Sequence, residues 1–178
     1  MLKFIRQALY RARQFFQALS ADLDEEDWQV LRENLTSEEL AAFGRMSAAD
    51  QRHSLEVYYT LVREGKTHPD LLKAALLHDI GKGEGDIHLW HRVAIVLIRA
   101  FFPIALKWLA VPDGWRRPFY IHYYHPIIGA EMAKRLGCSN LTVELILRHQ
   151  PTLELPPWHP SREELELLRA LQEVDGTK

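Results

Sequence analysis

The hydrophobic positions of this chain recur with the spacing of α-helices. Residues 2–19 place their apolar side chains within an arc of roughly 160° at 100° per residue, which is the pattern of an amphipathic helix. The polar side of this helix carries basic residues and no acid: Lys3, Arg6, Arg11 and Arg13. We expect it to dock on the rest of the domain or on a second subunit of a homodimer, and its charge also fits peripheral contact with a membrane surface.

Capping signals divide the rest of the chain into further helices. A hydroxyl residue followed three positions later by an acid marks a helix start at Thr36, at Ser47 with a shorter acid, and at Ser161. Glycine or proline marks most of the ends. The expected helices cover residues 24–35, 37 onward, 47–64, 69–81, 125–137, 140–149 and 161–175. No alternating pattern typical of strands occurs, so we expect an all-α bundle of six to nine helices.

The length and composition predict one main domain. A chain of 178 residues, 47% of them apolar, can bury one substantial core. We expect this domain at residues 47–178, after an N-terminal helical extension at residues 1–46. Within the main domain, residues 86–121 form an apolar and aromatic insertion.

The apolar segment from Val93 to Val111 is nearly long enough to cross a bilayer. A central Arg or Lys costs roughly 2.5 to 3.5 kcal/mol on insertion scales, and this segment contains Arg99 and Lys107. Pro103 also interrupts it. We therefore expect two helices with a break at Phe102-Pro103 rather than a membrane span.

The overall charge narrows the classes of partner. The formal net charge of −2 creates no global field that would gather nucleic acid, so no specific nucleic-acid binding is expected. An anionic ligand must be held by local chemistry. The single cysteine, Cys138, cannot form an internal disulfide, and no convincing signal peptide is present; both observations fit a cytoplasmic location.

An imidazole and a carboxylate stand side by side where a predicted helix reaches glycine. In the segment from His78 to Lys82, His78 and Asp79 are followed by Gly81. The imidazole suits a transition ion, the carboxylate can bridge two ions, and the glycine lets Lys82 turn toward the same pocket. Burying such a pair on an apolar helix costs free energy unless both groups are hydrogen-bonded.

Further candidate ligands lie at predicted helix ends. His125 begins one helix, His149 ends the next, and Asp175 ends the last. Side chains at the ends of several helices can converge at one end of a bundle and hold a metal. Each of them alone is ambiguous, because a single histidine on an apolar helix is more often a hydrogen-bonded core residue.

Together these residues resemble a known family. The order of His53, His78-Asp79 and Asp175 is similar to the H…HD…D signature of the HD superfamily, and residues 78–82 match its HDIG variant. The stretch from His125 to Glu131 resembles the HPxxGA motif of members with two metals, and His149 their last histidine. The resemblance implies a metal-dependent phosphohydrolase acting on a small phosphorylated molecule, such as a nucleotide.

The resemblance also implies a ligand set. His53, His78, Asp79 and Asp175 would hold one divalent transition ion, His125 and His149 a second, and Asp79 would bridge the two; iron, manganese, nickel, cobalt and zinc all suit such donors. Asp79 and Lys82 are then the catalytic candidates, with water activated by the metal as the nucleophile. The cyclic-di-GMP phosphodiesterase branch is disfavoured, because Gln150-Pro151 stands where many members have a second histidine and an acid, and no Gly-Tyr-Pro follows.

Substrate binding is assigned from local chemistry. Arg116 and Arg117 are candidates for gripping an anionic substrate, since guanidinium binds phosphate bidentately, although solvated surface charge is an equal alternative. His122 is a candidate partner of His125. Two other functions stay open: a di-iron oxygenase on the same ligands, and a metal-binding regulatory or membrane-surface module.

Overall fold

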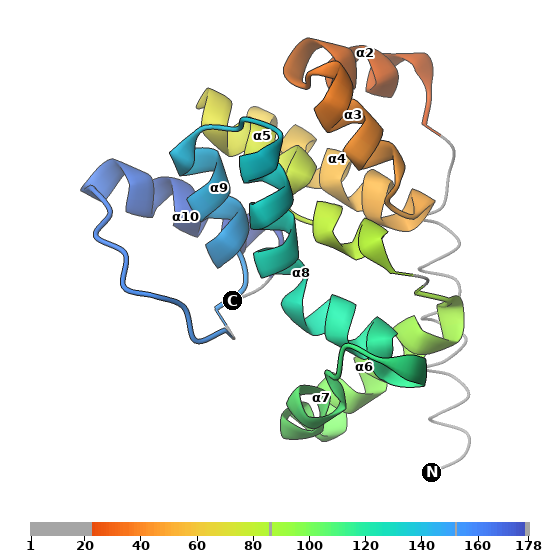
Figure 1. The fold of residues 1–178 in the computed structure, drawn as a ribbon. Coiled ribbons are helices and arrows are strands. Elements are labelled where there is room, and N and C mark those ends of the chain that lie inside the picture. The colour runs from red at the N-terminus through yellow and green to blue at the C-terminus, as the bar shows by residue number, and fades with distance from the viewer. Residues whose placement is uncertain (1–22, 86, 152, 177–178) are drawn as a thin grey trace.

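The computed structural model describes residues 23–85, 87–151 and 153–176, and within these ranges the chain is all-α (Figure 1). The amphipathic helix expected at 2–19 lies outside the described residues. The described helices are α2 (Glu25–Asn34), α3 (Ser37–Gly44), α4 (Ala48–Arg63), α5 (Pro69–Leu77), η1 (Ile80–Glu84), α6 (Leu89–Phe101), α7 (Pro103–Leu109), η2 (Gly114–Arg116), α8 (Arg117–Arg135), α9 (Asn140–Arg148) and α10 (Arg162–Val174), where η denotes a 3₁₀-helix. The expected all-α class is confirmed.

The predicted capping residues start the helices. Thr36 accepts from the backbone N–H of Glu39, whose carboxylate accepts in turn from the Thr36 N–H, and Ser161 forms the same reciprocal pair at the start of α10. Ser47 caps α4 but forms only half of a box. Its partner Asp50 has a carboxylate that accepts from the Ser47 hydroxyl at 2.6 Å instead of from the Ser47 backbone.

One buried cluster holds most of the bundle together. Leu31 of α2 and Phe43 of α3 belong to the same cluster as Leu55 of α4, Leu76 of α5 and Ile146 of α9, and each of these side chains is fully buried. Residues 23–46 therefore pack into the main core. The boundary at residue 46 stays a prediction.

The segment expected as an insertion forms a helical pair of its own. The chain breaks at Phe102 between α6 and α7. Ile95 of α6 and Leu106 of α7 pack on Phe119 in the N-terminal half of α8, apart from the main bundle (Figure 1). Among the described residues, no helix combines the length and the apolar character needed to cross a membrane. The expected break at Phe102-Pro103 is confirmed.

Two helix boundaries differ from expectation. The expected start at His125 is wrong, because α8 begins at Arg117 and runs through Pro126 without interruption. The expected end of the earlier helix at Gly81 is also wrong: α5 ends at Leu77, and η1 carries the chain on. This tighter turn leaves His78 and Asp79 between two helices.

Gly81 brings η1 against α8. A Cβ atom at this position would lie 2.3 Å from the carbonyl oxygen of His125 and 2.8 Å from the backbone nitrogen of Gly129. No side chain fits at such distances. The glycine therefore permits the backbone contact that sets Asp79 beside His125.

Candidate metal centre

Six side chains from five parts of the chain converge at one end of the bundle. α4 supplies His53, the turn after α5 supplies His78 and Asp79, and α8 supplies His125. His149 and Asp175 follow the last residues of α9 and α10. Their ligand atoms form three overlapping groups within 4.8 Å, namely His53-His78-Asp79, His78-His149-Asp175 and Asp79-His125-His149. We call these six residues the candidate metal centre.

Three of its histidine rings are oriented in the same way. The Nδ1 atoms of His78, His125 and His149 lie 2.9, 2.6 and 2.7 Å from the carbonyl oxygens of Ala75, His122 and Ile146, each three residues earlier. A carbonyl oxygen only accepts, so each ring carries its proton on Nδ1. In the neutral form of each ring the lone pair is then on Nε2, and a backbone carbonyl of this kind is a common outer partner of a metal-binding histidine.

Pro126 makes this orientation available to His125 in the middle of a helix. In a regular helix, the N–H of residue 126 would donate to the carbonyl of His122. Proline has no N–H, so that carbonyl is left for the His125 ring. The ring donates to the His122 carbonyl, which the helix leaves without a backbone donor, and this bond sets the direction of Nε2.

The Nε2 atoms face one another across a space that suits a cation. His125 Nε2 lies 3.2 Å from His149 Nε2 and 3.1 Å from Asp79 Oδ1. With the protons on Nδ1, these three atoms all present lone pairs, which repel unless a positive charge lies among them. Two atoms bound about 2.1 Å from one ion are separated by about 3.0 to 3.4 Å at tetrahedral or octahedral angles. The observed spacing fits a shared metal ion.

The other half of the centre is built around Asp175. Its Oδ1 atom accepts from His53 Nε2 at 2.8 Å and lies 3.4 Å from His78 Nε2. The His78 atom is buried and makes no hydrogen bond of its own in the described structure, although Asp79 Oδ2 lies 3.5 Å away. An unsatisfied buried nitrogen between two carboxylates is the arrangement expected of a ligand.

The buried carboxylates of Asp79 and Asp175 favour a positively charged His78, whereas the rings of His125 and His149 stay neutral. Burial alone would lower the pKa of His78, but the charges of Asp79 and Asp175 outweigh it and raise that pKa to about 9. Burial and the positive charge of His78 lower the pKa of His149 to about 3. Burial also dominates at His125 and lowers its pKa. Neutral imidazole is the form that binds metal.

A family model described as HD domain matches residues 51–176. The chain belongs to the HD domain family. All six residues of the candidate metal centre lie inside the matched range. HD domains are in general metal-dependent hydrolases. A search of curated proteins and a search of solved structures each found no match.

Lys82 of this HD domain reaches back to the candidate metal centre as expected. Its Nζ atom donates to Asp79 Oδ2 at 2.5 Å and lies 3.7 Å from Asp50 Oδ1. Burial would lower the pKa of Lys82, but Asp79 and Asp50 outweigh it and raise that pKa. The ammonium group therefore stays charged beside the site.

Sequence reasoning missed Asp50 and Arg92 as parts of the site. Arg92 of α6 donates to both carboxylate oxygens of Asp50, at 3.1 and 2.5 Å. Burial raises the pKa of Asp50, but Lys82 and Arg92 outweigh it, so the net effect is a lowered pKa. The signal in the sequence was the acid three positions after Ser47, which the capping pattern accounted for without a role in the site.

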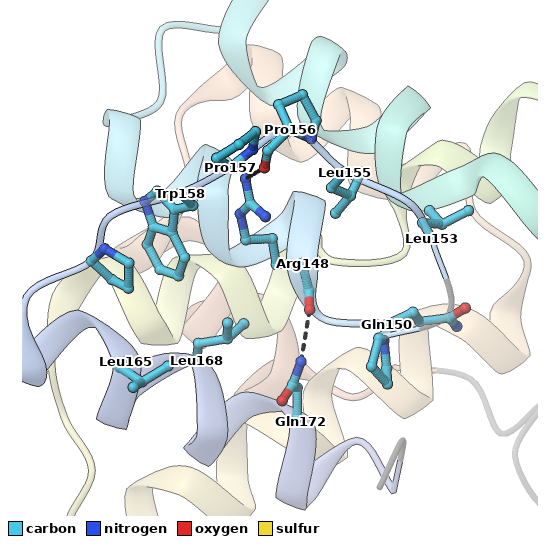
Figure 2. Close-up of a pocket in the computed structure, with 12 residues that line it drawn as sticks. Arg148, Gln150, Leu153, Leu155, Pro156, Pro157, Trp158, Leu165, Leu168 and Gln172 are labelled. Atoms are coloured by element: carbon cyan, nitrogen blue, oxygen red, sulfur yellow. Dashed lines mark hydrogen bonds between the residues drawn. The ribbon is translucent and has the colours of Figure 1, made fainter.

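The end of α9 in this HD domain is fixed by its neighbours. Gln172 of α10 donates to the carbonyl of Arg148 at 2.8 Å, and Arg148 donates to the carbonyl of Pro156 at 2.9 Å (Figure 2). The Arg148 guanidinium also stacks 5.2 Å from the ring centroid of Trp158. These contacts hold the residue before His149. Arg148, Trp158 and Gln172 line a cavity of about 460 Å³ together with Gln150. Gln150 Nε2 lies 3.4 Å from His125 Nε2, although none of the six residues of the candidate metal centre lines this cavity.

Of the three candidate substrate-binding residues, His122 lies nearer the candidate metal centre than the two adjacent arginines. His122 is one turn before His125, with ring centroids 5.8 Å apart, and its carbonyl orients the His125 ring. Arg117 begins α8, and the rise from it to His125 along the helix is about 12 Å. Arg116 precedes it in η2. The role of all three as substrate ligands stays a prediction.

Proposed function

We propose that this HD domain hydrolyses a phosphate ester or anhydride of a small phosphorylated molecule with the help of two divalent transition ions. The observation that carries the proposal is the convergence of Asp79 Oδ1, His125 Nε2 and His149 Nε2 as three lone-pair atoms about one point. Family membership supports the same class of chemistry.

The six residues divide into two sets of ligands. His53, His78, Asp79 and Asp175 would hold one ion, and His125 and His149 would hold a second together with Asp79. Ions bound in this way supply Lewis acidity, which activates water near neutral pH and stabilises negative charge on a phosphoryl group. The carbonyl bonds from Nδ1 keep the histidines in the tautomer that binds metal.

The cations beside the centre supply the substrate site. Lys82 lines a cavity of about 230 Å³ together with Arg45, Ser47, His88 and Arg92, and no acidic residue is among the lining residues. Guanidinium and ammonium groups bind phosphate oxygens. A phosphoryl group next to Asp79 would therefore meet Lys82 first, and the remaining anionic part of the substrate would extend toward Arg45.

The only cysteine of the chain is unsuited to act as a nucleophile. The Cys138 thiol lies 3.0 Å from Glu39 Oε1 and donates to it, and Cys138 belongs to none of the three ligand groups of the candidate metal centre. Burial and the Glu39 carboxylate raise the pKa of Cys138 to about 12. The thiolate needed for attack is therefore scarce at neutral pH, which favours water as the attacking group.

The decisive experiment combines metal analysis with a substrate screen. Nucleotides and phosphomonoesters are tested with Mn²⁺, Fe²⁺, Co²⁺, Ni²⁺ and Zn²⁺, and Asp79→Ala is compared with the exposed loop variant Asp113→Ala. We expect Asp79→Ala to lose both bound metal and phosphate release, while Asp113→Ala keeps both. Turnover retained in Asp79→Ala would exclude the proposed site.

Two other outcomes would replace the proposal. Oxygen consumption with iron and no phosphate release from any compound would favour a di-iron oxygenase. A purified protein that binds no ion under any condition would favour a regulatory or membrane-surface module.

A further inference from the structure

The helical pair α6–α7 exposes large aromatic side chains. Among the described residues, the large hydrophobic side chains with high exposure are, apart from Val62, all in this pair or just after it: Trp90 (56%), Val96 (46%), Phe101 (68%), Phe102 (69%), Trp108 (77%) and Trp115 (67%). Single exposed apolar residues are ordinary, but a group of this size on one segment marks an interaction surface.

α6 is apolar on both sides. Its inner side packs through Ile95 and Ile98 on Phe119. At 100° per residue, a second apolar face follows the outer side within an arc of about 80° and consists of Trp90, Val93, Leu97 and Phe101. A helix on the surface of a globular protein is normally polar on its outer side. The outer face of α6 therefore requires an apolar partner.

The charges around this surface identify the partner. Residues 87–117 contain five basic residues and one acid, Asp113; Lys107 is exposed on α7, and Arg116 and Arg117 follow Trp115. The ion pair of Lys107 with Glu154 is long, at 3.6 Å, and both groups are exposed, so it offsets little of this charge. Basic residues beside exposed Trp and Phe complement an anionic lipid headgroup over an acyl region.

The lengths of the helices fix how they meet a bilayer. α6 has 13 residues and α7 has 7. At 1.5 Å per residue, α6 is about 20 Å long, which is less than the roughly 30 Å of a bilayer core. We infer that the outer face of α6 and the aromatic residues of α7 and η2 bind the surface of an anionic phospholipid membrane, with the helices in the plane of the interface.

The sequence of residues 2–19, which lie outside the described residues, also combines apolar positions with four basic residues and no acid. The inferred membrane surface does not depend on the proposed function, because none of its residues belongs to the candidate metal centre.

Vesicle flotation tests the inference on the full chain. Vesicles of phosphatidylcholine alone and with about one third phosphatidylglycerol are mixed with the wild type, with the triple variant Phe101→Ser, Phe102→Ser, Trp108→Ser, and with the control Val62→Ser on α4. We expect the wild type and the control to float with the anionic vesicles. The triple variant should bind them at least about tenfold more weakly, because its apolar contact area is lost.

Three results would overturn the inference. The first is no binding of the wild type to anionic vesicles, and the second is equal binding of the triple variant. The third is a dimer of the wild type that the triple variant dissociates in light scattering without any vesicle binding, which would make the surface an interface between two copies. Circular dichroism and bound metal, unchanged in the triple variant, show that it remains folded.

Discussion

The His125 ring donates from Nδ1 to the carbonyl oxygen of His122 at 2.6 Å, within one uninterrupted helix. The bond exists because the next residue, Pro126, cannot donate to that carbonyl. A residue that normally weakens a helix therefore orients a candidate metal ligand. Proline at position 126 is consequently expected to lower stability and to raise metal affinity.

Pro126→Ala is expected to separate these two properties. Alanine restores the backbone donor, so the metal-free protein should gain roughly 1 to 3 kcal/mol in free energy of unfolding. The restored N–H competes with the His125 ring, and metal affinity should fall by about tenfold. Chemical denaturation and metal titration measure the two effects. Pro69→Ala, at the start of α5, is the control and should leave the affinity unchanged; an unchanged affinity in Pro126→Ala would refute the role given to the proline.

Lys82→Met is expected to damage both stability and turnover. It leaves the buried carboxylates Asp79 and Asp50 with one cation fewer, and the metal-free protein should lose about 3 kcal/mol. Phosphate release should fall at least about a hundredfold, because the charge facing the phosphoryl group is gone. Lys66→Met removes a surface pair with Glu64 and should cost less than about 1 kcal/mol. Equal losses in the two variants would argue against a special role for Lys82.

Gly81→Ala should disrupt the contact between η1 and α8. The added methyl group would collide with the backbone at His125 and Gly129, neither of which is the end of a flexible side chain. We expect a loss of more than about 3 kcal/mol and a drop in metal binding. Gly44→Ala is the matched control, because its Cβ would have open space and the substitution should stabilise α3 by about 0.5 to 1 kcal/mol. Thermal unfolding of both proteins distinguishes these effects.

Acid should destabilise the protein through carboxylates outside the candidate metal centre. Burial would raise the pKa of Glu39, but hydrogen bonds from the Thr36 N–H, Cys138 and Lys73 outweigh it and lower that pKa. Burial would also raise the pKa of Asp27, but hydrogen bonds from Arg52, the Asp24 N–H and Tyr59 outweigh it and lower that pKa. The unfolded chain therefore binds more protons in acid, and stability is lost as the pH falls from about 5 through the folded pKa values.

The variant Glu39→Gln tests this dependence. Denaturation at a series of pH values should show a shallower loss of stability below about pH 5 than in the wild type, with parallel curves above it. Glu131→Gln, which removes an exposed pair with Arg135, should follow the wild type throughout. A wild-type slope preserved in Glu39→Gln would assign the acid sensitivity to other groups.

The sequence predicted those parts of the fold that depend on local signals. The caps at Thr36 and Ser161 and the break before Pro103 act within one turn of helix, and the structure contains all three. The start of α8 was predicted at the wrong proline. A proline usually marks the first turn of a helix; Pro118 does so in α8, whereas Pro126 lies inside it, where the compensating bond comes from the His125 side chain.

The same distinction holds for the candidate site. The order of six ligand types along the chain indicated which residues to compare, and the structure brings their ligand atoms together. The pair of Asp50 with Arg92 was missed, because it joins residues 42 positions apart on helices that no local pattern places side by side. Arg116 and Arg117 carry the right chemistry for phosphate, but chemistry alone does not locate a side chain.

The bond between His53 and Asp175 spans 122 residues and ties the last helix of the chain back to α4. Apolar contacts such as that of Leu171 hold the body of α10, and Asp175 directly after it contacts His53 in the candidate metal centre. An ion held by these two residues would join the end of α10 to α4. Hydrogen exchange of the last amides of α10 would then slow as more of the protein carries metal.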